Sequence, residues 1–260
     1  MINKEKVIPF IKNALEEDIR EGDHSSLACI PNSKIGRAKL LIKENGIIAG
    51  IELSKWIFEY INPLLKVQIH LKDGDPVKKG DIAFTVEGPS ISLLSGERLV
   101  LNCMQRMSAI ATKTNAYVKI LQGTKTTVLD TRKTTPGIRI LEKWAVKIGG
   151  GQNHRFGLYD MIMLKDNHID FAGGIKQAIT KVKNYLKNNQ LNLKVEVEAR
   201  NLLEVKEIIA VGGIDRIMLD NFTPKETSEA LKLIDNKYET ESSGGITSKT
   251  IRTYAECGVD

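Results

Sequence analysis

The sequence predicts an α/β protein whose second half is a (β/α) barrel. From residue 124 onward, short apolar runs of strand length alternate with segments of helical length. Such alternation is typical of parallel strands joined by crossover helices. Five full strand–helix units and the start of a sixth favour a barrel over an open sheet. The chain carries no glycine-rich dinucleotide fingerprint and no P-loop motif, so we expect neither nucleotide site of that kind.

The first part of the chain has a different pattern. An apolar stripe predicts a helix over residues 4–20, and residues 34–50 predict two strands joined by a turn at Asn45-Gly46. A short helix is expected over 51–61. Two further strands are expected around the turns DGDP and KKGD, and a long helix over 90–121.

The barrel elements are predicted as follows. The strands are TTVLD, MIML, KVEVEA, RIMLD and residues 238–242, and Val259 begins one more. The helices cover about residues 138–148, ending at Gly149, then 172–187, 201–210, one that begins at Pro224, and one from Thr247 to Cys257.

Composition excludes several classes of protein. With 42% hydrophobic and 27% charged residues the chain is globular. Its net charge of +6 suits anionic ligands but is too small for a nucleic-acid-binding tail. The three cysteines Cys29, Cys103 and Cys257 form no CxxC pair, so we expect a reducing, cytoplasmic location. We find no signal peptide and no apolar run of membrane-spanning length, so no membrane partner is expected.

Residues 130–167 form the most basic stretch that also contains tight turns. Seven lysines and arginines stand against four acids, beside the only triple glycine, Gly149-Gly150-Gly151. Guanidinium groups match carboxylate and phosphate oxygens in pairs, and glycines let backbone N–H groups approach an anion. A solvated basic surface is the simpler interpretation. The charges abut the apolar runs VLD and MIML, which favours a polyanion site.

Polar residues follow each predicted barrel strand. They are Asp130 to Lys133, Lys165 to Asn167, Glu198, Asp220-Asn221 and, at the end of the last strand, Glu241 to Gly245. In a β/α barrel these positions converge on the catalytic mouth, so we expect an active site there. Glu198 and Asp220 lie on consecutive strands and could hold Mg²⁺ together with a substrate phosphate. The Ser-Gly-Gly turn before a predicted helix suits a phosphate group.

The segments DTRKTTPG, GGGQNHRFGLYD, KDNH, LDNF and ESSGG, in this order, resemble the quinolinate phosphoribosyltransferase family, also called nicotinate-nucleotide pyrophosphorylase (carboxylating). The resemblance runs from ALEEDIREGDHSS to YAECGVD. It implies an enzyme, a pentosyltransferase of de novo NAD biosynthesis. This enzyme converts quinolinate and phosphoribosyl pyrophosphate, with Mg²⁺, into nicotinate mononucleotide, pyrophosphate and CO₂. The implied fold is an N-terminal α/β sandwich with a linking helix (residues 1–110) followed by an incomplete TIM-like (β/α) barrel (111–260).

The resemblance also implies a role for each matching residue. Arg132, His154, Arg155 and Lys165 would hold the quinolinate carboxylates, joined by Arg98 from the other subunit of a homodimer with shared active sites. Lys133 would bind phosphoribosyl pyrophosphate, Glu198 and Asp220 the ribose and metal, and Ser243, Gly244 and Gly245 the 5′-phosphate. Lys165, Glu198 and Asp220 are the expected catalytic residues. From its helical pattern alone Arg98 would be a structural surface residue, so the resemblance reverses that interpretation.

Two features depart from the family pattern. Ala109 stands where a glycine is expected, and the chain stops at Asp260, where family members continue. We therefore expect a truncated C-terminal end. Three other functions compete: a pyrophosphorylase-like relative associated with molybdate transport, an aldolase-type barrel with a Schiff base on Lys165, and a non-catalytic nucleic-acid-binding protein. The retained LKDNH segment favours the quinolinate enzyme over the first of these.

Overall fold

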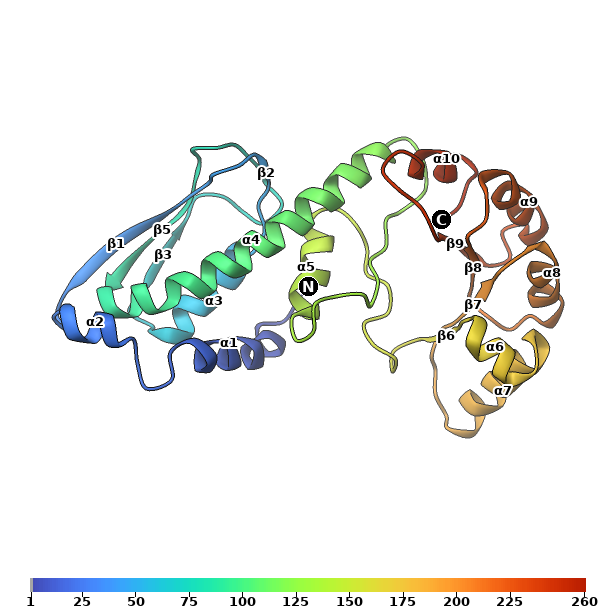
Figure 1. The fold of residues 1–260 in the computed structure, drawn as a ribbon, viewed down its shortest axis with the longest axis horizontal. Helices are drawn as coiled ribbons and strands as arrows, with labels where there is room; N and C mark the ends of the chain where they lie inside the picture. Colours follow the sequence, from blue (N-terminus) through green and yellow to red (C-terminus); the bar gives the residue numbers. More distant parts are fainter. Residues whose placement is uncertain (1) are drawn as a thin grey trace. The chain divides into compact units, whose positions relative to one another are not determined.

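The computed structural model describes residues 2–260, which form two compact units (Figure 1). The first unit runs to Ala116 and includes Lys133–Asn153. The second comprises Tyr117–Arg132 and His154–Asp260. One unit contains an antiparallel sheet covered by helices and the other a parallel sheet with crossover helices. The predicted fold class, an α/β sandwich followed by an incomplete barrel, is thereby confirmed.

The first unit is built on a three-stranded antiparallel sheet. Its order is β1 (Ile35–Leu41), β5 (Ile82–Pro89), β3 (Lys66–Ile69). Three helices contribute to the same apolar core, namely α1 (Lys4–Asp18), α3 (Ile51–Ile61) and α4 (Ser90–Ile120). The helices predicted over 4–20, 51–61 and 90–121 are therefore confirmed. Gly50 is the N-cap of helix α3, and the Asp73 carboxylate accepts hydrogen bonds from the backbone N–H groups of Gly50 and Ile51.

The predicted hairpin over residues 34–50 was wrong. Strand β1 pairs with β5, whereas β2 (Gly46–Ile47) pairs with β4 (Pro76–Val77) in a separate two-stranded sheet. The Asn45 side-chain oxygen accepts a bond from the Lys79 N–H. This bond joins the Asn45 turn to the segment that follows β4, in agreement with the β2–β4 pairing. The polar connection before β1 also contains a short helix, α2 (His24–Cys29), which Asp23 caps by accepting from the Ser26 N–H.

Helix α5 (Arg139–Ile148) belongs to the core of the first unit through Leu141 and Ala145. It ends at Gly149, as predicted. A Cβ at this position would lie 2.5 Å from the carbonyl oxygen of Ala111 on α4, so only glycine fits. The Arg106 guanidinium on α4 binds Glu142 at 2.7 Å, and Glu142 also accepts from the Thr135 N–H. These contacts hold the turn that follows Lys133.

The second unit contains a four-stranded parallel sheet. Its order is β6 (Ile162–Leu164), β7 (Val195–Ala199), β8 (Arg216–Asp220) and β9 (Glu239–Ser243). The connecting helices are α6 (Asp166–Ala172), α7 (Ile175–Asn188), α8 (Leu202–Val211) and α9 (Pro224–Ile234). Helices α7, α8 and α9 lie along one face of the sheet, where they share an apolar core with the strands (Figure 1). All four of these strands were predicted.

The edges of this unit differ from the expectation. The predicted strand TTVLD forms only a bridge at Leu129, and Val259 begins no strand. The two segments bond to each other instead, since the Thr127 N–H donates to the Asp260 carbonyl at 2.8 Å. Helix α6 forms separately from α7 because Gly173 and Gly174 both adopt positive φ. Helix α10 (Ile251–Glu256) begins later than the predicted Thr247.

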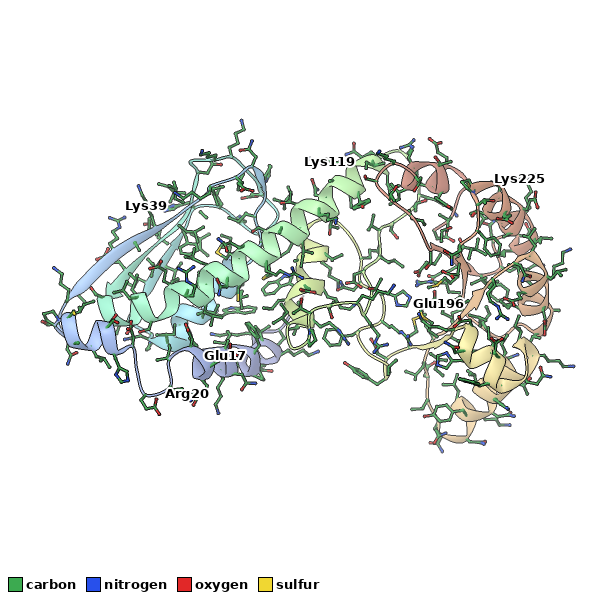
Figure 2. The ribbon with its side chains drawn as sticks, viewed as in Figure 1. Glu17, Arg20, Lys39, Lys119, Glu196 and Lys225 are labelled. Atoms are coloured by element: carbon green, nitrogen blue, oxygen red, sulfur yellow. The ribbon has the colours of Figure 1, made fainter. Side chains whose placement is uncertain are left out.

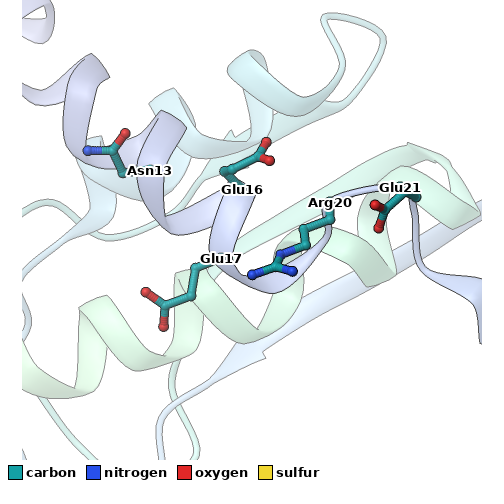
Figure 3. Close-up of a pocket in the computed structure, with 5 residues that line it drawn as sticks. All are labelled: Asn13, Glu16, Glu17, Arg20 and Glu21. Carbon is teal, nitrogen blue, oxygen red and sulfur yellow. The ribbon is translucent and has the colours of Figure 1, made fainter.

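A shallow depression lies along α1 and the turn after it, lined by Asn13, Glu16, Glu17, Arg20 and Glu21 (Figure 3). It contains none of the predicted site residues. Within residues 2–260, no helix combines the length and apolarity needed to cross a bilayer.

Candidate active site

Polar residues of the parallel sheet share one face. On β7, Glu196 and Glu198 alternate with Val195, Val197 and Ala199, which belong to the helix-covered core. Strand side chains alternate between faces, so both glutamates point away from the helices. The register pairs Glu196 with Arg216 and Asp220 with Ser243. The polar residues of β7, β8 and β9 therefore meet on the face opposite the helices.

Asp220 and Ser243 form the carboxyl-end rim of this face. The Ser243 hydroxyl donates to Asp220 Oδ1 at 3.1 Å, and the Asn221 side chain donates to Asp220 Oδ2 at 2.7 Å. The Asn221 N–H also donates to the Ser243 carbonyl at 2.8 Å. The ends of β8 and β9, where polar site residues were predicted, are thus joined by hydrogen bonds.

Glu198 lies below this rim and is buried. Burial is the largest cause that raises the pKa of its carboxyl, followed by the negative charge of Asp220, while the Lys165 ammonium opposes both. Two carboxylates that destabilise each other's charge would be stabilised by a divalent cation. Glu198 and Asp220 therefore fit the predicted Mg²⁺ site in donor type and in charge.

The Ser-Gly-Gly turn depends on its glycines. Gly244 and Gly245 have φ values of +88° and +64°, in the region that side chains other than glycine rarely adopt. Since neither residue carries a Cβ, the backbone N–H groups of this turn can approach phosphate oxygens closely. The predicted contribution of a helix dipole was wrong, because α10 begins only at Ile251.

Gly244→Ala is expected to destabilise the protein by about 3 kcal/mol or more, since a Cβ would overlap the Asn221 side chain and lie 2.9 Å from its backbone nitrogen. Gly245→Ala is the matched control. A Cβ there meets no atom within 4 Å, so only backbone strain remains, about 1–2 kcal/mol. Urea unfolding of both variants measures the difference. Equal losses would show that contact with Asn221 does not determine the cost at Gly244.

Arg132 and Arg155 lie near each other in the second unit. Burial lowers the pKa of the Arg155 guanidinium, and the positive charge of Arg132 lowers it further, whereas Glu196 and Asp160 oppose this. The Arg155 side chain also donates to the Met161 carbonyl at 3.3 Å. Two guanidinium groups that repel each other are stabilised when an anion binds between them. This pair suits a ligand with carboxylate groups.

The turn after His154 is held by two carboxylates. Asp130 accepts from the His154 N–H at 2.9 Å. Asp160 accepts from the N–H groups of Phe156 and Gly157 at 2.7 and 2.8 Å. Both ends of this turn are therefore anchored, and Arg155 lies between the anchors.

A buried cluster of charged side chains lies deeper on the same face, and Figure 2 labels its Glu196. His154 Nε2 lies 2.7 Å from Glu196 Oε2 and 3.5 Å from Glu241 Oε2. Arg216 Nη1 lies 3.7 and 3.3 Å from the same two carboxylate oxygens. The ring nitrogen and the two carboxylates could hold a metal ion, since their ligand atoms lie within 4.8 Å of one another. However, Arg216 already supplies a positive charge there.

Sequence reasoning missed Glu196 and Arg216 and noted Glu241 only as part of a strand end. A signal was present, because the run V-E-V-E places glutamates at every second position of a strand expected to be buried on both faces. Buried charges at such positions are paired or functional. Reading the alternation would have predicted Glu196 as an inward-facing residue.

The free energy of unfolding should depend on the proton of Glu241. Burial raises the pKa of this carboxyl from 4.5 to about 7, and the Glu196 charge adds to the effect. The folded state binds the proton more tightly than the unfolded state, so this group loses its stabilising contribution as pH rises from about 4.5 to about 7. Relative to Glu241→Gln, wild type should lose up to about 3 kcal/mol across this window.

Urea unfolding of both proteins at about pH 5 and about pH 8 measures that loss. Glu239→Gln is the matched control, because Glu239 also binds Arg216 but is exposed. A pH dependence that Glu241→Gln leaves unchanged would assign the proton to another group.

The remaining predicted residues lie in different places. Lys165 is exposed directly before α6, and its backbone N–H donates to His168 Nδ1 at 3.1 Å. Lys133 and Arg98 belong to the first unit, Lys133 in the turn before α5 and Arg98 exposed on α4. The second unit therefore brings together Glu198 with Asp220 and Lys165, Asp220 with Ser243, and Arg132 with Arg155 and His154. The roles of all these residues stay predictions.

A parallel α/β unit with cations, carboxylates and a glycine turn at its strand ends is typical of barrel proteins that bind small polyanions. Family models describe it more closely. The model for the C-terminal domain of quinolinate phosphoribosyl transferase matches residues 110–260, and the model for the N-terminal domain matches residues 23–108. The chain belongs to the quinolinate phosphoribosyl transferase family, as its motifs predicted. The expected domain boundary at residue 110 stays a prediction. The packing units follow the chain less simply, since the segment of α5 belongs to the first unit.

Individual relatives agree with the family models. Quinolinate phosphoribosyltransferase (decarboxylating) 1b of Nicotiana tabacum is 44% identical over 264 residues, covering 96% of this chain and 75% of the relative. The probable nicotinate-nucleotide pyrophosphorylase (carboxylating) of Bacillus subtilis is 42% identical, covering 94% and 83%. The crystal structure of NadC from Streptococcus pyogenes superposes with a TM-score of 0.93 at 37% identity, covering 100% and 90%. None of these matches favours the relative associated with molybdate transport.

Proposed function

We propose that this protein transfers the phosphoribosyl group of phosphoribosyl pyrophosphate to quinolinate. The products are nicotinate mononucleotide, pyrophosphate and CO₂, as in de novo NAD biosynthesis. The observation that carries the proposal is the Arg132–Arg155 pair, in a chain whose relatives are named for this reaction. Two adjacent guanidinium groups suit a dicarboxylate such as quinolinate.

The chemistry requires little acid–base catalysis. The pyridine nitrogen attacks C1 of the ribose as pyrophosphate leaves, so positive charge develops on the sugar and negative charge on the leaving group. Arg132, Arg155 and Lys165 would hold the quinolinate carboxylates, with His154 beside them. Glu198 and Asp220 would face the positive ribose, and Lys133 would bind phosphoribosyl pyrophosphate. Positioning and fixed charges can supply most of the rate enhancement in such a reaction.

The 5′-phosphate would bind at Ser243, Gly244 and Gly245. Positive φ at both glycines supports this assignment, because their backbone N–H groups can approach phosphate oxygens closely. After the transfer, the pyridinium ring withdraws electrons and stabilises the carbanion left when CO₂ departs, and this carbanion then takes a proton from water to give nicotinate mononucleotide. That last step depends on the substrate itself.

Mg²⁺ would be held by Glu198 and Asp220, whose charges destabilise each other in its absence. When bound, Mg²⁺ neutralises phosphate charge on the pyrophosphate leaving group. Burial is the largest cause of the raised pKa of Glu198, and the cation would relieve the repulsion from Asp220 that adds to it.

The direct test of the function is product formation. Purified protein is incubated with quinolinate, phosphoribosyl pyrophosphate and Mg²⁺, and nicotinate mononucleotide is measured by chromatography. Product that appears only when both substrates are present would support the proposal. Folded protein that forms none would overturn it.

Asp220→Asn should raise the Mg²⁺ concentration required for half-maximal turnover by at least about tenfold, because one charged metal ligand is lost. KM for quinolinate should stay within about twofold, since the carboxylates of that substrate are assigned to the arginines. Steady-state rates at varied Mg²⁺ measure both quantities. The control is Asp170→Asn, an exposed carboxylate on α6 that pairs with Arg200. The assignment of Asp220 to Mg²⁺ fails if Asp220→Asn weakens the binding of quinolinate and of Mg²⁺ equally.

The working assembly would be a homodimer in which Arg98 of one chain reaches the site of the other. In support, Arg98 is exposed on α4 beside Leu94, whose side chain is 42% exposed. Arginine is enriched at protein interfaces. A cytoplasmic location stays a prediction, since some plant relatives are named chloroplastic or mitochondrial. We expect no nucleic-acid partner.

A further inference from the structure

The hydrogen bonds of His154 assign its tautomer. The Arg155 backbone N–H donates to His154 Nδ1 at 2.7 Å. A ring nitrogen that accepts a hydrogen bond carries no proton, so the ring proton lies on Nε2. Nε2 faces Glu196 Oε2 at 2.7 Å and donates to it. His154 is therefore a neutral ring whose two nitrogens are both bonded within the second unit.

Glu196 is well placed to determine this state. Its side chain has no exposed surface, so its orientation is determined by the protein alone. Arg216 Nη1 lies 3.7 Å from the Oε2 that accepts from His154. Arg216 is itself held by Glu239 at 2.9 Å and by Glu241 at 3.3 Å. The position of Glu196 Oε2 is thus set by its contacts with His154 and Arg216 and not by solvent.

We propose that Glu196 is a positioning residue for substrate binding, which holds His154 in the Nε2–H form so that its Nδ1 anchors the Arg155 backbone. The chain of contacts runs from Arg216 to Glu196, to His154 Nε2, and from His154 Nδ1 to the Arg155 N–H. The proposal rests on the proposed function, because Arg155 is taken there as a ligand of quinolinate. Glu196 would not touch the substrate.

This arrangement changes the part expected of His154. A carboxylate ligand would need a ring N–H donor directed at the substrate, and the only ring proton is already donated to Glu196. His154 would act through Arg155 instead. If the tautomer were reversed, a proton on Nδ1 would oppose the Arg155 N–H at 2.7 Å and displace it. Arg155 would then lose its backbone anchor while keeping its charge.

The tautomer is measured by ¹⁵N NMR of protein labelled at histidine, because protonated and unprotonated ring nitrogens have well-separated shifts. The chain has four histidines, and His154→Asn identifies the signal to follow. Wild type should show Nε2–H with an unprotonated Nδ1. Glu196→Gln should keep this state, since the amide oxygen can accept the same bond, whereas Glu196→Leu should lose it. The control is Glu239→Gln, which alters only an exposed partner of Arg216.

Substrate constants provide the second measurement. Glu196→Leu should raise KM for quinolinate by about tenfold or more and leave KM for phosphoribosyl pyrophosphate within about twofold. In Glu196→Gln, KM for quinolinate should stay close to the wild-type value. Thermal unfolding verifies that each variant is folded. Equal changes in both KM values, or no change in folded Glu196→Leu, would overturn the proposal.

Wild-type NMR also tests the proposal without any variant. A proton on Nδ1 of His154 would overturn it even if Glu196→Leu failed to fold. The spectrum does not depend on turnover, so absence of product would count against the proposed function while the tautomer remained measurable.

Discussion

Arg98→Ala and Arg132→Ala proteins are each expected to lose activity almost completely, and a mixture of the two is expected to regain up to about a quarter of wild-type activity. In a two-fold dimer with shared sites, a mixed dimer carries both lesions in one site and leaves the other intact. Random pairing makes half of the dimers mixed, each with one working site of two. Activity is measured after subunit exchange, which mass spectrometry of the dimers confirms.

A matched control comes from two residues expected in the same barrel site. Arg132→Ala mixed with Lys165→Ala should stay inactive, because each chain would bring one damaged barrel site to the dimer. Exchange that occurs while the Arg98–Arg132 mixture remains inactive would assign Arg98 to its own chain's site or to none. An active monomer would also exclude the shared site.

Much of the fold could be predicted because local patterns and tertiary structure agree. Helices α1, α3 and α4 carry apolar stripes that are buried, and strands β6, β7 and β8 are short, mostly apolar runs bounded by turn residues. The β1–β2 hairpin could not be predicted correctly. Asn45-Gly46 is a favoured hairpin sequence, yet Asn45 bonds the distant Lys79. The local preference of Asn45-Gly46 for a hairpin turn was therefore outweighed by a contact between segments separated by 34 positions.

The candidate site was predicted best where residues follow strands. Glu198, Asp220 and Ser243 meet because parallel strands end at one edge. The buried layer below them was missed, since Glu196 and Arg216 come before the strand ends and pair only across the sheet. Their pairing depends on register, which the alternation of one strand does not reveal. The hydrogen bond from the Arg155 N–H to His154 Nδ1 could not be predicted either, because it depends on the local backbone geometry and not on the residue types.

The protein is expected to use quinolinate at least about 100-fold more efficiently than nicotinate, measured as kcat/KM. Arg132, Arg155 and Lys165, joined by Arg98 in the proposed dimer, carry more positive charge than one carboxylate can balance. Nicotinate lacks the second carboxylate, and two charge-assisted hydrogen bonds are worth about 3–6 kcal/mol together. A loss of that size corresponds to a factor of about 10² to 10⁴. Arg155→Ala should reduce the ratio of the kcat/KM values for quinolinate and nicotinate, mainly because it weakens the binding of quinolinate.

Arg200→Ala serves as the matched control for charge. Arg200 belongs to the same unit, but its guanidinium is held by Glu204 and Asp170 at 2.7 and 3.1 Å. Its removal should leave the ratio of the two kcat/KM values unchanged. Comparable turnover of nicotinate by wild type would mean that the cations are balanced by groups of the protein itself. In that case the Arg132–Arg155 pair would serve the fold, and the substrate would have to be sought among monocarboxylates.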